Sequence, residues 1–193
     1  PPNTTYALHP ALPDGTNGWD ISPVEVTLIG VDNLSGLGYS EYRVDNGRWQ
    51  LHTGSFMFTM DGEHTITYRS IDAVGNMEAS QSFDVKLDTT LPTMSLRTPE
   101  NGLYLFGRKI LELPNQTIII GSILVEIDVE DTPSGMQCVE FYLDDDLQET
   151  DAEGPYEWTL DTFGFGRTTL EIVAVDIAGN RAAISKTMWL FNI

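Results

Sequence analysis

The residues of this chain that are best suited to do chemistry are aspartates at the ends of predicted strands. Asp32 and Asp131 each follow a stretch in which apolar and polar residues alternate, and Asp72 and Asp176 each close another such stretch. If these strands lie in facing sheets and leave them at the same end, two carboxylates meet at one rim. Neighbouring carboxylates repel each other, so proton sharing, backbone N–H groups or a hard cation must relieve the repulsion.

Two interpretations of these aspartates stay open. In the simpler one, each carboxylate accepts hydrogen bonds from the backbone of its own Asp-Xaa-Xaa-Gly turn. In the other, Ca²⁺ binds the carboxylate oxygens, as it does in many proteins. Asp131 and Asp176 are the favoured calcium ligands because Asp88 can join them, and Asp32 with Asp72 is the corresponding pair. The sequence indicates no other cofactor.

The sequence does not indicate an enzyme. It contains no metal-binding His-Glu-x-x-His, no Gly-x-Ser-x-Gly nucleophile turn, no phosphate-binding loop and no Cys-x-x-Cys pair. His9, His52 and His64 lie in separate segments, and Cys138 is the only cysteine. The neighbouring Glu140 disfavours a thiolate at Cys138. We therefore expect no catalytic residues.

Exposed aromatic side chains could instead form a binding surface, because sugar rings stack on Trp and Tyr. Most tryptophans pack in cores or at their edges, and this is the default expectation here. Tyr142 alternates outward between Phe141 and Leu143, which makes it the best exposed candidate. The other candidates are Trp19, Trp49, Trp158, Trp189, Tyr39 and Tyr104.

The charge balance excludes several partners. The 193 residues include 29 Asp and Glu but only 10 Lys and Arg, for a net charge of −19. Nucleic acids and anionic membrane surfaces both require clustered basic residues. No stretch is long and apolar enough to insert into a membrane. The tripeptides at Asn3, Asn33 and Asn115 match the N-glycosylation pattern, and whether they carry carbohydrate depends on the source organism.

Four motifs recur in the same order, at offsets between 99 and 104 residues. The matching segments are 32–36 with 131–135, 41–45 with 140–144, 54–56 with 154–156, and 72–76 with 176–180. A period of this size predicts two copies of one domain, at residues 1–90 and 91–193. Pro92 makes the segment between them short and semi-rigid.

Alternation of apolar and polar residues predicts strands rather than helices throughout the chain. The apolar phase includes Val24, Val26 and Leu28 in the first copy and Ile123 and Val125 in the second. About seven short strands in each copy, separated by turns, predict an all-β fold of two tandem immunoglobulin-like antiparallel β-sandwiches.

Two local features refine this organisation. Asn46-Gly47 is a strong hairpin signal, because both residues readily adopt a positive φ. Residues 101–114 have no counterpart in the first copy and are too apolar for a free loop. We expect this insertion to pack along a sandwich edge.

Segments 17–19, 41–45 and 68–72, together with 154–158 and 176–180, resemble Ig-like repeats of secreted and cell-surface proteins of bacteria and archaea. The resemblance implies an extracellular, non-catalytic spacer or adhesion module. Its partners would be other domains of a larger protein, and a cell-surface protein or polysaccharide. The alternative is an accessory carbohydrate- or protein-binding module of a secreted hydrolase, which an exposed aromatic strip on one sheet would favour. A third and weaker interpretation is a filament subunit, which a free edge strand would favour.

Overall fold

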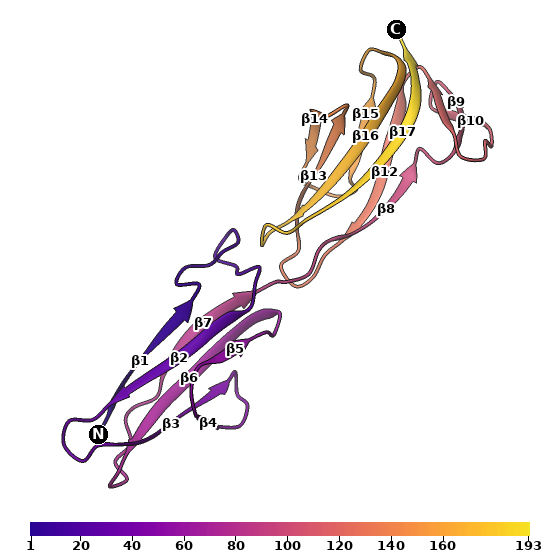
Figure 1. Cartoon of the computed structure of the whole chain (residues 1–193). Helices are drawn as coiled ribbons and strands as arrows, with labels where there is room; N and C mark the ends of the chain where they lie inside the picture. The colour runs from indigo at the N-terminus through magenta and orange to yellow at the C-terminus, as the bar shows by residue number, and fades with distance from the viewer. The chain divides into compact units, whose positions relative to one another are not determined.

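The computed structural model describes all 193 residues, which form two compact units, Pro1–Thr89 and Thr90–Ile193. Both units consist of β-strands joined by turns and loops (Figure 1). The all-β class predicted from the alternation of apolar and polar residues is confirmed. No helix in the chain is long and apolar enough to cross a membrane.

Unit 1 is a sandwich of two antiparallel sheets. One sheet has the strand order β1-β2-β5 and the other the order β4-β3-β6-β7. The strands are β1 (Asn3–His9), β2 (Val24–Val31), β3 (Leu37–Val44), β4 (Gln50–His52), β5 (Phe56–Phe58), β6 (Gly62–Asp72) and β7 (Gln81–Leu87).

The core of unit 1 lies between the two sheets. Val24, Val26 and Leu28 of β2 pack there against Ile66 and Tyr68 of β6. The period-two pattern places Val24, Val26 and Leu28 inward, so the predicted phase of β2 is confirmed. Burial of an apolar side chain of this size stabilises a fold by about 1.5–3 kcal/mol.

The predicted hairpin is present, since β3 and β4 pair antiparallel and the N–H of Gly47 donates to the carbonyl oxygen of Val44 at 2.9 Å, but the positive φ expected at Asn46 and Gly47 is not found. The residue with a positive φ is Asp45, at 53°, and neither Asn46 nor Gly47 has one. β3 continues its pairing with β6 as far as Val44, whereas its pairing with β4 stops earlier. The chain therefore needs a longer loop between β3 and β4 than a two-residue turn.

Unit 2 is a second sandwich, with sheets in the order β15-β12-β8 and β10-β9-β11-β17-β16-β13-β14. Its core includes Val125, Val139, Phe141, Ile172 and Leu190. The strands are β8 (Thr93–Thr98), β9 (Gly102–Leu105), β10 (Arg108–Leu111), β11 (Thr117–Ile120), β12 (Ile123–Glu130), β13 (Met136–Leu143), β14 (Asp146–Asp151), β15 (Glu157–Leu160), β16 (Gly164–Asp176) and β17 (Arg181–Asn192).

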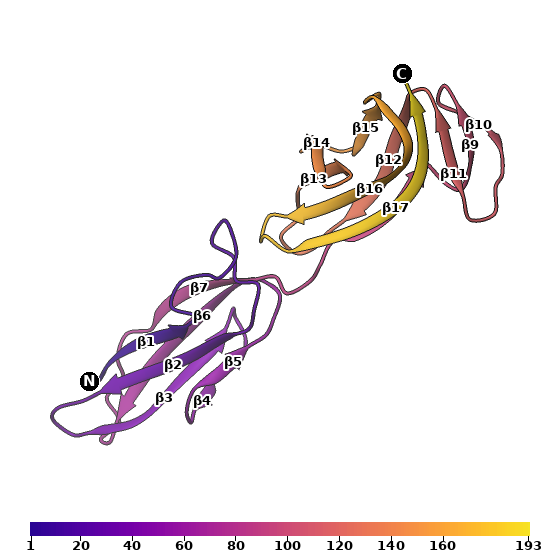
Figure 2. The ribbon, with the colours of Figure 1, turned by 45° about the horizontal axis from the view of Figure 1, so that its top comes forward.

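The apolar insertion forms strands at the edge of the larger sheet. β9 and β10 make an antiparallel hairpin, and β11 pairs in parallel with both β9 and β17. Figure 2 shows this group of strands beside β17. The prediction that the insertion packs along a sandwich edge is confirmed.

Candidate functional site

In unit 1, Asp32 closes the turn that follows β2. Its Oδ1 accepts hydrogen bonds from the backbone N–H groups of Leu34, Ser35 and Gly36, at 3.0, 2.8 and 3.0 Å. Desolvation raises the pKa of the Asp32 carboxyl, but these bonds outweigh it and hold that pKa below its ordinary value. The backbone of its own turn thus stabilises the charged form of Asp32.

Asp72 does the same for the turn that follows β6. Its Oδ1 accepts from the N–H groups of Val74 (3.1 Å) and Asn76 (2.7 Å), and its Oδ2 accepts from Nδ2 of Asn76 at 2.7 Å. The N–H of Ala73 also donates to the carbonyl oxygen of Gly36 at 2.9 Å. The turns of Asp32 and Asp72 therefore meet at one end of unit 1.

In unit 2, Asp176 closes the turn that follows β16. Its Oδ1 accepts from the N–H groups of Gly179 and Asn180 at 2.7 and 2.8 Å, and its Oδ2 accepts from Nδ2 of Asn180 at 2.9 Å. Oδ2 of Asp131, after β12, accepts from the N–H of Gly135 at 3.0 Å. Both carboxylates have the turn-closing role of their unit 1 counterparts.

The two turns of unit 2 are also bonded to each other. The N–H of Ile177 donates to the carbonyl oxygen of Gly135 at 2.8 Å, and the N–H of Ala178 donates to Oγ of Ser134 at 3.3 Å. Asp131 and Asp176 thus lie on interlocked turns at one end of unit 2. In both units, backbone and Asn side-chain donors supply the stabilisation that neighbouring carboxylates require.

Calcium binding at these turns stays a prediction. Asp88 follows β7 in unit 1, whereas Asp131 and Asp176 belong to unit 2. The expectation that the three share an ion, and that Asp32 and Asp72 form a similar pair, rests on the residue types. Carboxylate oxygens are suitable Ca²⁺ ligands, and turn hydrogen bonds alone also explain why aspartates stand at these positions.

Thermal unfolding separates the two interpretations of the aspartates. If calcium binds the folded chain, millimolar CaCl₂ raises the melting temperature more than NaCl of equal ionic strength does. A ligand at a hundred times its Kd stabilises the folded state by about 2.7 kcal/mol. The Asp176→Asn variant should lose this calcium-specific increment, whereas Asp146→Asn, at an exposed position of β14, should keep it. Equal shifts in both salts would show that the carboxylates only close turns.

The stability of unit 1 should depend on the charge of Asp72. Desolvation raises the pKa of this carboxyl, but the bonds from Asn76 and Val74 outweigh it and lower the pKa from 3.8 to about 2. Because the folded-state pKa is the lower one, the stabilisation is complete above about pH 4 and is lost as the pH falls toward 2. Urea unfolding at several acidic pH values should show a shallower decline for Asp72→Asn than for the unchanged chain. Equal slopes would contradict this role.

The side chains that could form a nucleophile–base pair are the three histidines and Cys138. The three histidines belong to unit 1 and Cys138 to unit 2. Nδ1 of His64 lies 3.0 Å from Oδ2 of Asp45, which raises the pKa of His64, whereas burial lowers the pKa of His52. Burial and then the charge of Glu140 raise the pKa of the half-buried Cys138 thiol. These contacts do not activate Cys138 as a nucleophile.

The aromatic candidates differ widely in exposure. Trp19 and Trp158 are buried, which agrees with the expectation that most tryptophans pack in cores or at their edges. Trp49 is half-buried and lies beneath two guanidinium groups, those of Arg43 and Arg69, at 4.9 and 4.1 Å from its ring centre. Each such contact is worth about 0.5–1 kcal/mol at an exposed site, so this ring already has a structural role.

The prediction that Tyr142 is the best exposed aromatic is wrong. Tyr142 is half-buried and its hydroxyl donates to Oε2 of Glu140 at 2.8 Å, because β13 lies between β14 and β16. Phe165, at the start of β16, is 78 % exposed, and Trp189 is 45 % exposed. Phe165 was not among the predicted aromatic candidates, although its position between Gly164 and Gly166 is a signal for an unshielded side chain.

Comparison with protein families bears on unit 2. Residues 92–180 match the family model of the Bacterial Ig domain. Unit 2 is similar to a bacterial Ig domain. The match includes no residue of unit 1, so the two-copy organisation stays a prediction. No curated protein matches the chain.

Several solved structures are similar to the chain at low sequence identity. The fibronectin(III)-like modules of Clostridium thermocellum CbhA are 12 % identical with a TM-score of 0.47, and the match covers 97 % of this chain and 95 % of that one. The D00-D0 domain of intimin is 12 % identical with a TM-score of 0.39, covering 97 % and 100 %. A 1.5-MDa bacterial ice-binding adhesin is 10 % identical with a TM-score of 0.35, covering 100 % and 66 %.

Proposed function

We propose that the chain is a non-catalytic, extracellular segment of a larger bacterial or archaeal surface or secreted protein, in which it acts as a spacer and adhesion module. The observation that carries this proposal is that each unit encloses a core of its own. Only five residues connect the last strand of unit 1, which ends at Leu87, to the first strand of unit 2, which begins at Thr93. Such an organisation suits modules that are added in series.

The polar residues support the same function. The four turn aspartates take part in hydrogen bonds that close their turns, and Arg69, Arg97 and Arg181 form ion pairs with other strands of their own units. These groups stabilise the fold and leave no constellation of nucleophile, base and oxyanion donor. The similarity of residues 92–180 to a bacterial Ig domain supports the bacterial setting.

An accessory binding module is the second candidate. The exposed aromatic side chains of Phe165 and Trp189 favour it, because an exposed apolar surface of this kind commonly contacts a partner. This candidate is compatible with a spacer, since the same segment can separate other domains and present a binding face.

Force spectroscopy on the full chain tests the spacer function. A chain pulled from its two ends should unfold in two separate events, each resisting extension, because each unit has its own core. The events should release about 300 and 350 Å of extended chain. A single event, or extension without resistance, would contradict the proposal that two modules transmit load in series.

A further inference from the structure

One face of unit 2 carries two ordered rows of apolar side chains. The rows cross the five strands β10, β9, β11, β17 and β16, on the side of the sheet that faces away from the core. The first row is Leu111, Leu103, Ile118, Trp189 and Arg167, and the second is Arg108, Leu105, Ile120, Phe191 and Phe165. The register of the strands places the members of each row side by side.

Burial along each strand confirms that the rows face outward. Tyr104, Ile119 and Leu190 point into the core and are almost fully buried. Their neighbours Leu105, Ile120 and Trp189 are 41, 37 and 45 % exposed, because successive side chains of a strand point to opposite faces. The rings of Trp189 and Phe191 are nearly parallel, and Phe165 meets Phe191 edge-on at 5.2 Å between ring centres. The eight apolar residues thus form one continuous surface.

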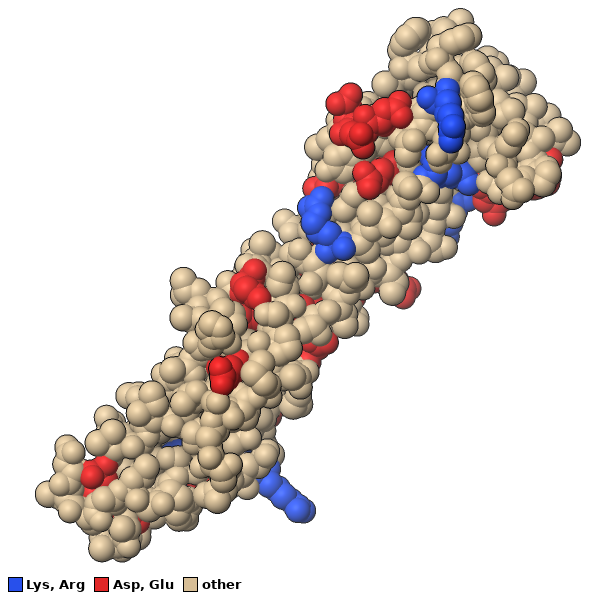
Figure 3. Space-filling view, in the orientation of Figure 1, with Lys and Arg blue, Asp and Glu red and all other residues tan.

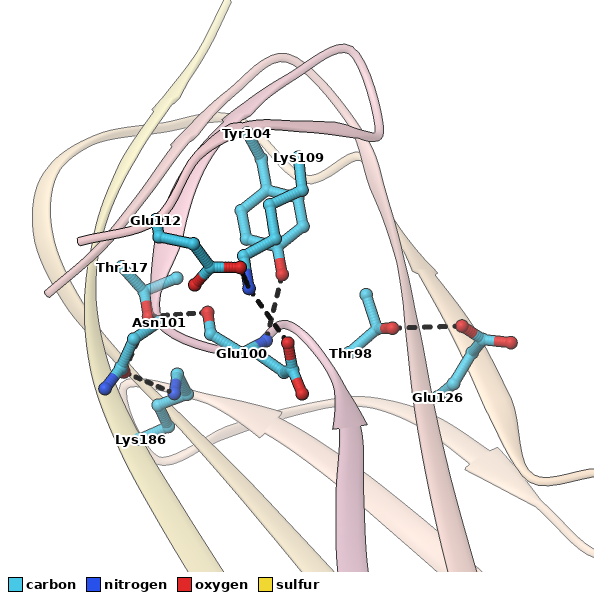
Figure 4. A network of polar contacts seen from close by, with 9 residues as sticks. All are labelled: Thr98, Glu100, Asn101, Tyr104, Lys109, Glu112, Thr117, Glu126 and Lys186. Atoms are coloured by element: carbon cyan, nitrogen blue, oxygen red, sulfur yellow. Dashed lines mark hydrogen bonds and ion pairs between the residues drawn. The ribbon is translucent and has the colours of Figure 1, made fainter. Parts of the chain in front are cut away.

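Hydrogen bonds hold the strands of this face in place (Figure 4). Nζ of Lys109 lies 2.8 Å from a carboxylate oxygen of Glu100 and 2.7 Å from one of Glu112. The N–H of Glu100 donates to the hydroxyl of Tyr104 at 3.0 Å, and Oγ1 of Thr117 donates to the carbonyl oxygen of Glu100 at 3.0 Å. These bonds tie the β9–β10 hairpin to β11, so the outer face is formed before any partner arrives.

The two charged residues of these rows are both positive. Arg108 and Arg167 occupy opposite corners of the two rows, and the rows contain no acidic residue. Neither arginine forms an ion pair or a side-chain hydrogen bond. The other four basic residues of unit 2 all bond to acceptors of the chain: Arg97, Lys109, Arg181 and Lys186. On the side drawn in Figure 3, acidic and basic side chains of unit 2 are both visible, and some lie next to each other.

Two unpaired arginines beside an apolar surface are unexpected in a chain with 29 acidic residues. Asp144 bonds to Thr168 and Thr169, next to Arg167, but no carboxylate forms an ion pair with either arginine of the rows. The surface is therefore complementary to a partner that presents apolar side chains flanked by carboxylates.

We propose that the outer face of β10, β9, β11, β17 and β16 is a docking surface for an acidic protein segment with apolar side chains. Sugar is the poorer occupant, because the aliphatic residues of the rows offer its hydroxyl groups no hydrogen-bond partner. A second copy of the same face is also a poorer occupant, because its two arginines would lie against the two arginines of the first copy.

Binding of two synthetic peptides to the full chain tests this proposal. In one peptide Leu alternates with Glu, and in the other Leu alternates with Lys. We expect the Glu peptide to bind at least tenfold more tightly to the unaltered chain, with binding that weakens as NaCl is raised. The preference should disappear in the double variant Arg108→Glu, Arg167→Glu. The control Arg48→Glu removes an exposed, unpaired arginine of unit 1 and should leave the preference unchanged.

Three results would overturn the proposal. The first is equal affinity for both peptides, and the second is a preference that survives the double variant. The third is that neither peptide binds, whereas phosphatidylglycerol vesicles or a neutral oligosaccharide such as cellohexaose do bind. That binding would have to be lost when Phe165 and Trp189 are replaced. Because the peptide comparison uses the unaltered chain, it stands even if the double variant does not fold. The force experiment on the spacer function is independent of all these outcomes.

Discussion

Replacement of Asp176 by Ala is expected to lower the free energy of unfolding of unit 2 by about 3–5 kcal/mol. The carboxylate accepts three hydrogen bonds, from two backbone N–H groups and from the side chain of Asn180. Asp176 is fully buried, and the loss of a charged acceptor leaves buried donors without a partner, which costs about 1–3 kcal/mol for each group. The turn after β16 should therefore become the weakest point of unit 2.

Urea unfolding of the full chain, followed by the indole N–H resonance of Trp158 in ¹H–¹⁵N spectra, measures this loss. Asp146→Ala is the matched control, because Asp146 lies exposed at the start of β14 and its removal should change the stability by no more than about 0.5 kcal/mol. A loss below about 1 kcal/mol in Asp176→Ala would show that the turn does not depend on its carboxylate.

Replacement of Phe141 by Ala should destabilise unit 2 by about 3–5 kcal/mol and leave unit 1 unchanged. Phe141 has no exposed surface and lies at the centre of the core, with its ring centre 5.9 Å from that of Trp158. Removal of a buried aromatic ring costs its transfer free energy and leaves a cavity. Because unit 1 has a different core, its unfolding transition should keep its midpoint.

Amide hydrogen exchange resolves the two units within one sample. In Phe141→Ala, protection should fall in β12, β13 and β16 and persist in β2 and β6. Leu147→Ala is the control, since Leu147 is exposed on β14 and its loss should not change protection in the core. Loss of protection in β2 and β6 as well would contradict the separation of the two cores.

The strands of both sandwiches could be predicted because one face of each strand is buried. In β2 and β12 the alternation of apolar and polar residues directly identifies Val24, Val26, Ile123 and Val125 as inward-facing. Local spacing also predicts the turn-closing role of Asp72 and Asp176, since the donors lie within four residues of each carboxylate.

Other features depend on contacts between distant segments. Residues 118–120 are three consecutive isoleucines, and such a run does not reveal which of them face the core. Only the parallel pairing of β11 with β9 and β17 places Ile119 inside and Ile118 and Ile120 on the outer face. The docking surface was for this reason not predictable from the sequence. The exposure of Tyr142 was misjudged because its cross-strand neighbours were unknown.

The central claim is that the chain consists of two separately folded β-sandwich modules. Nuclear magnetic resonance tests it most directly, by comparison of the ¹H–¹⁵N spectrum of the full chain with the spectra of residues 1–89 and 90–193 produced separately. We predict that each fragment gives dispersed β-sheet resonances, and that the resonances of its core strands match those of the same strands in the full chain. A collapsed, unfolded spectrum from either fragment would contradict the account.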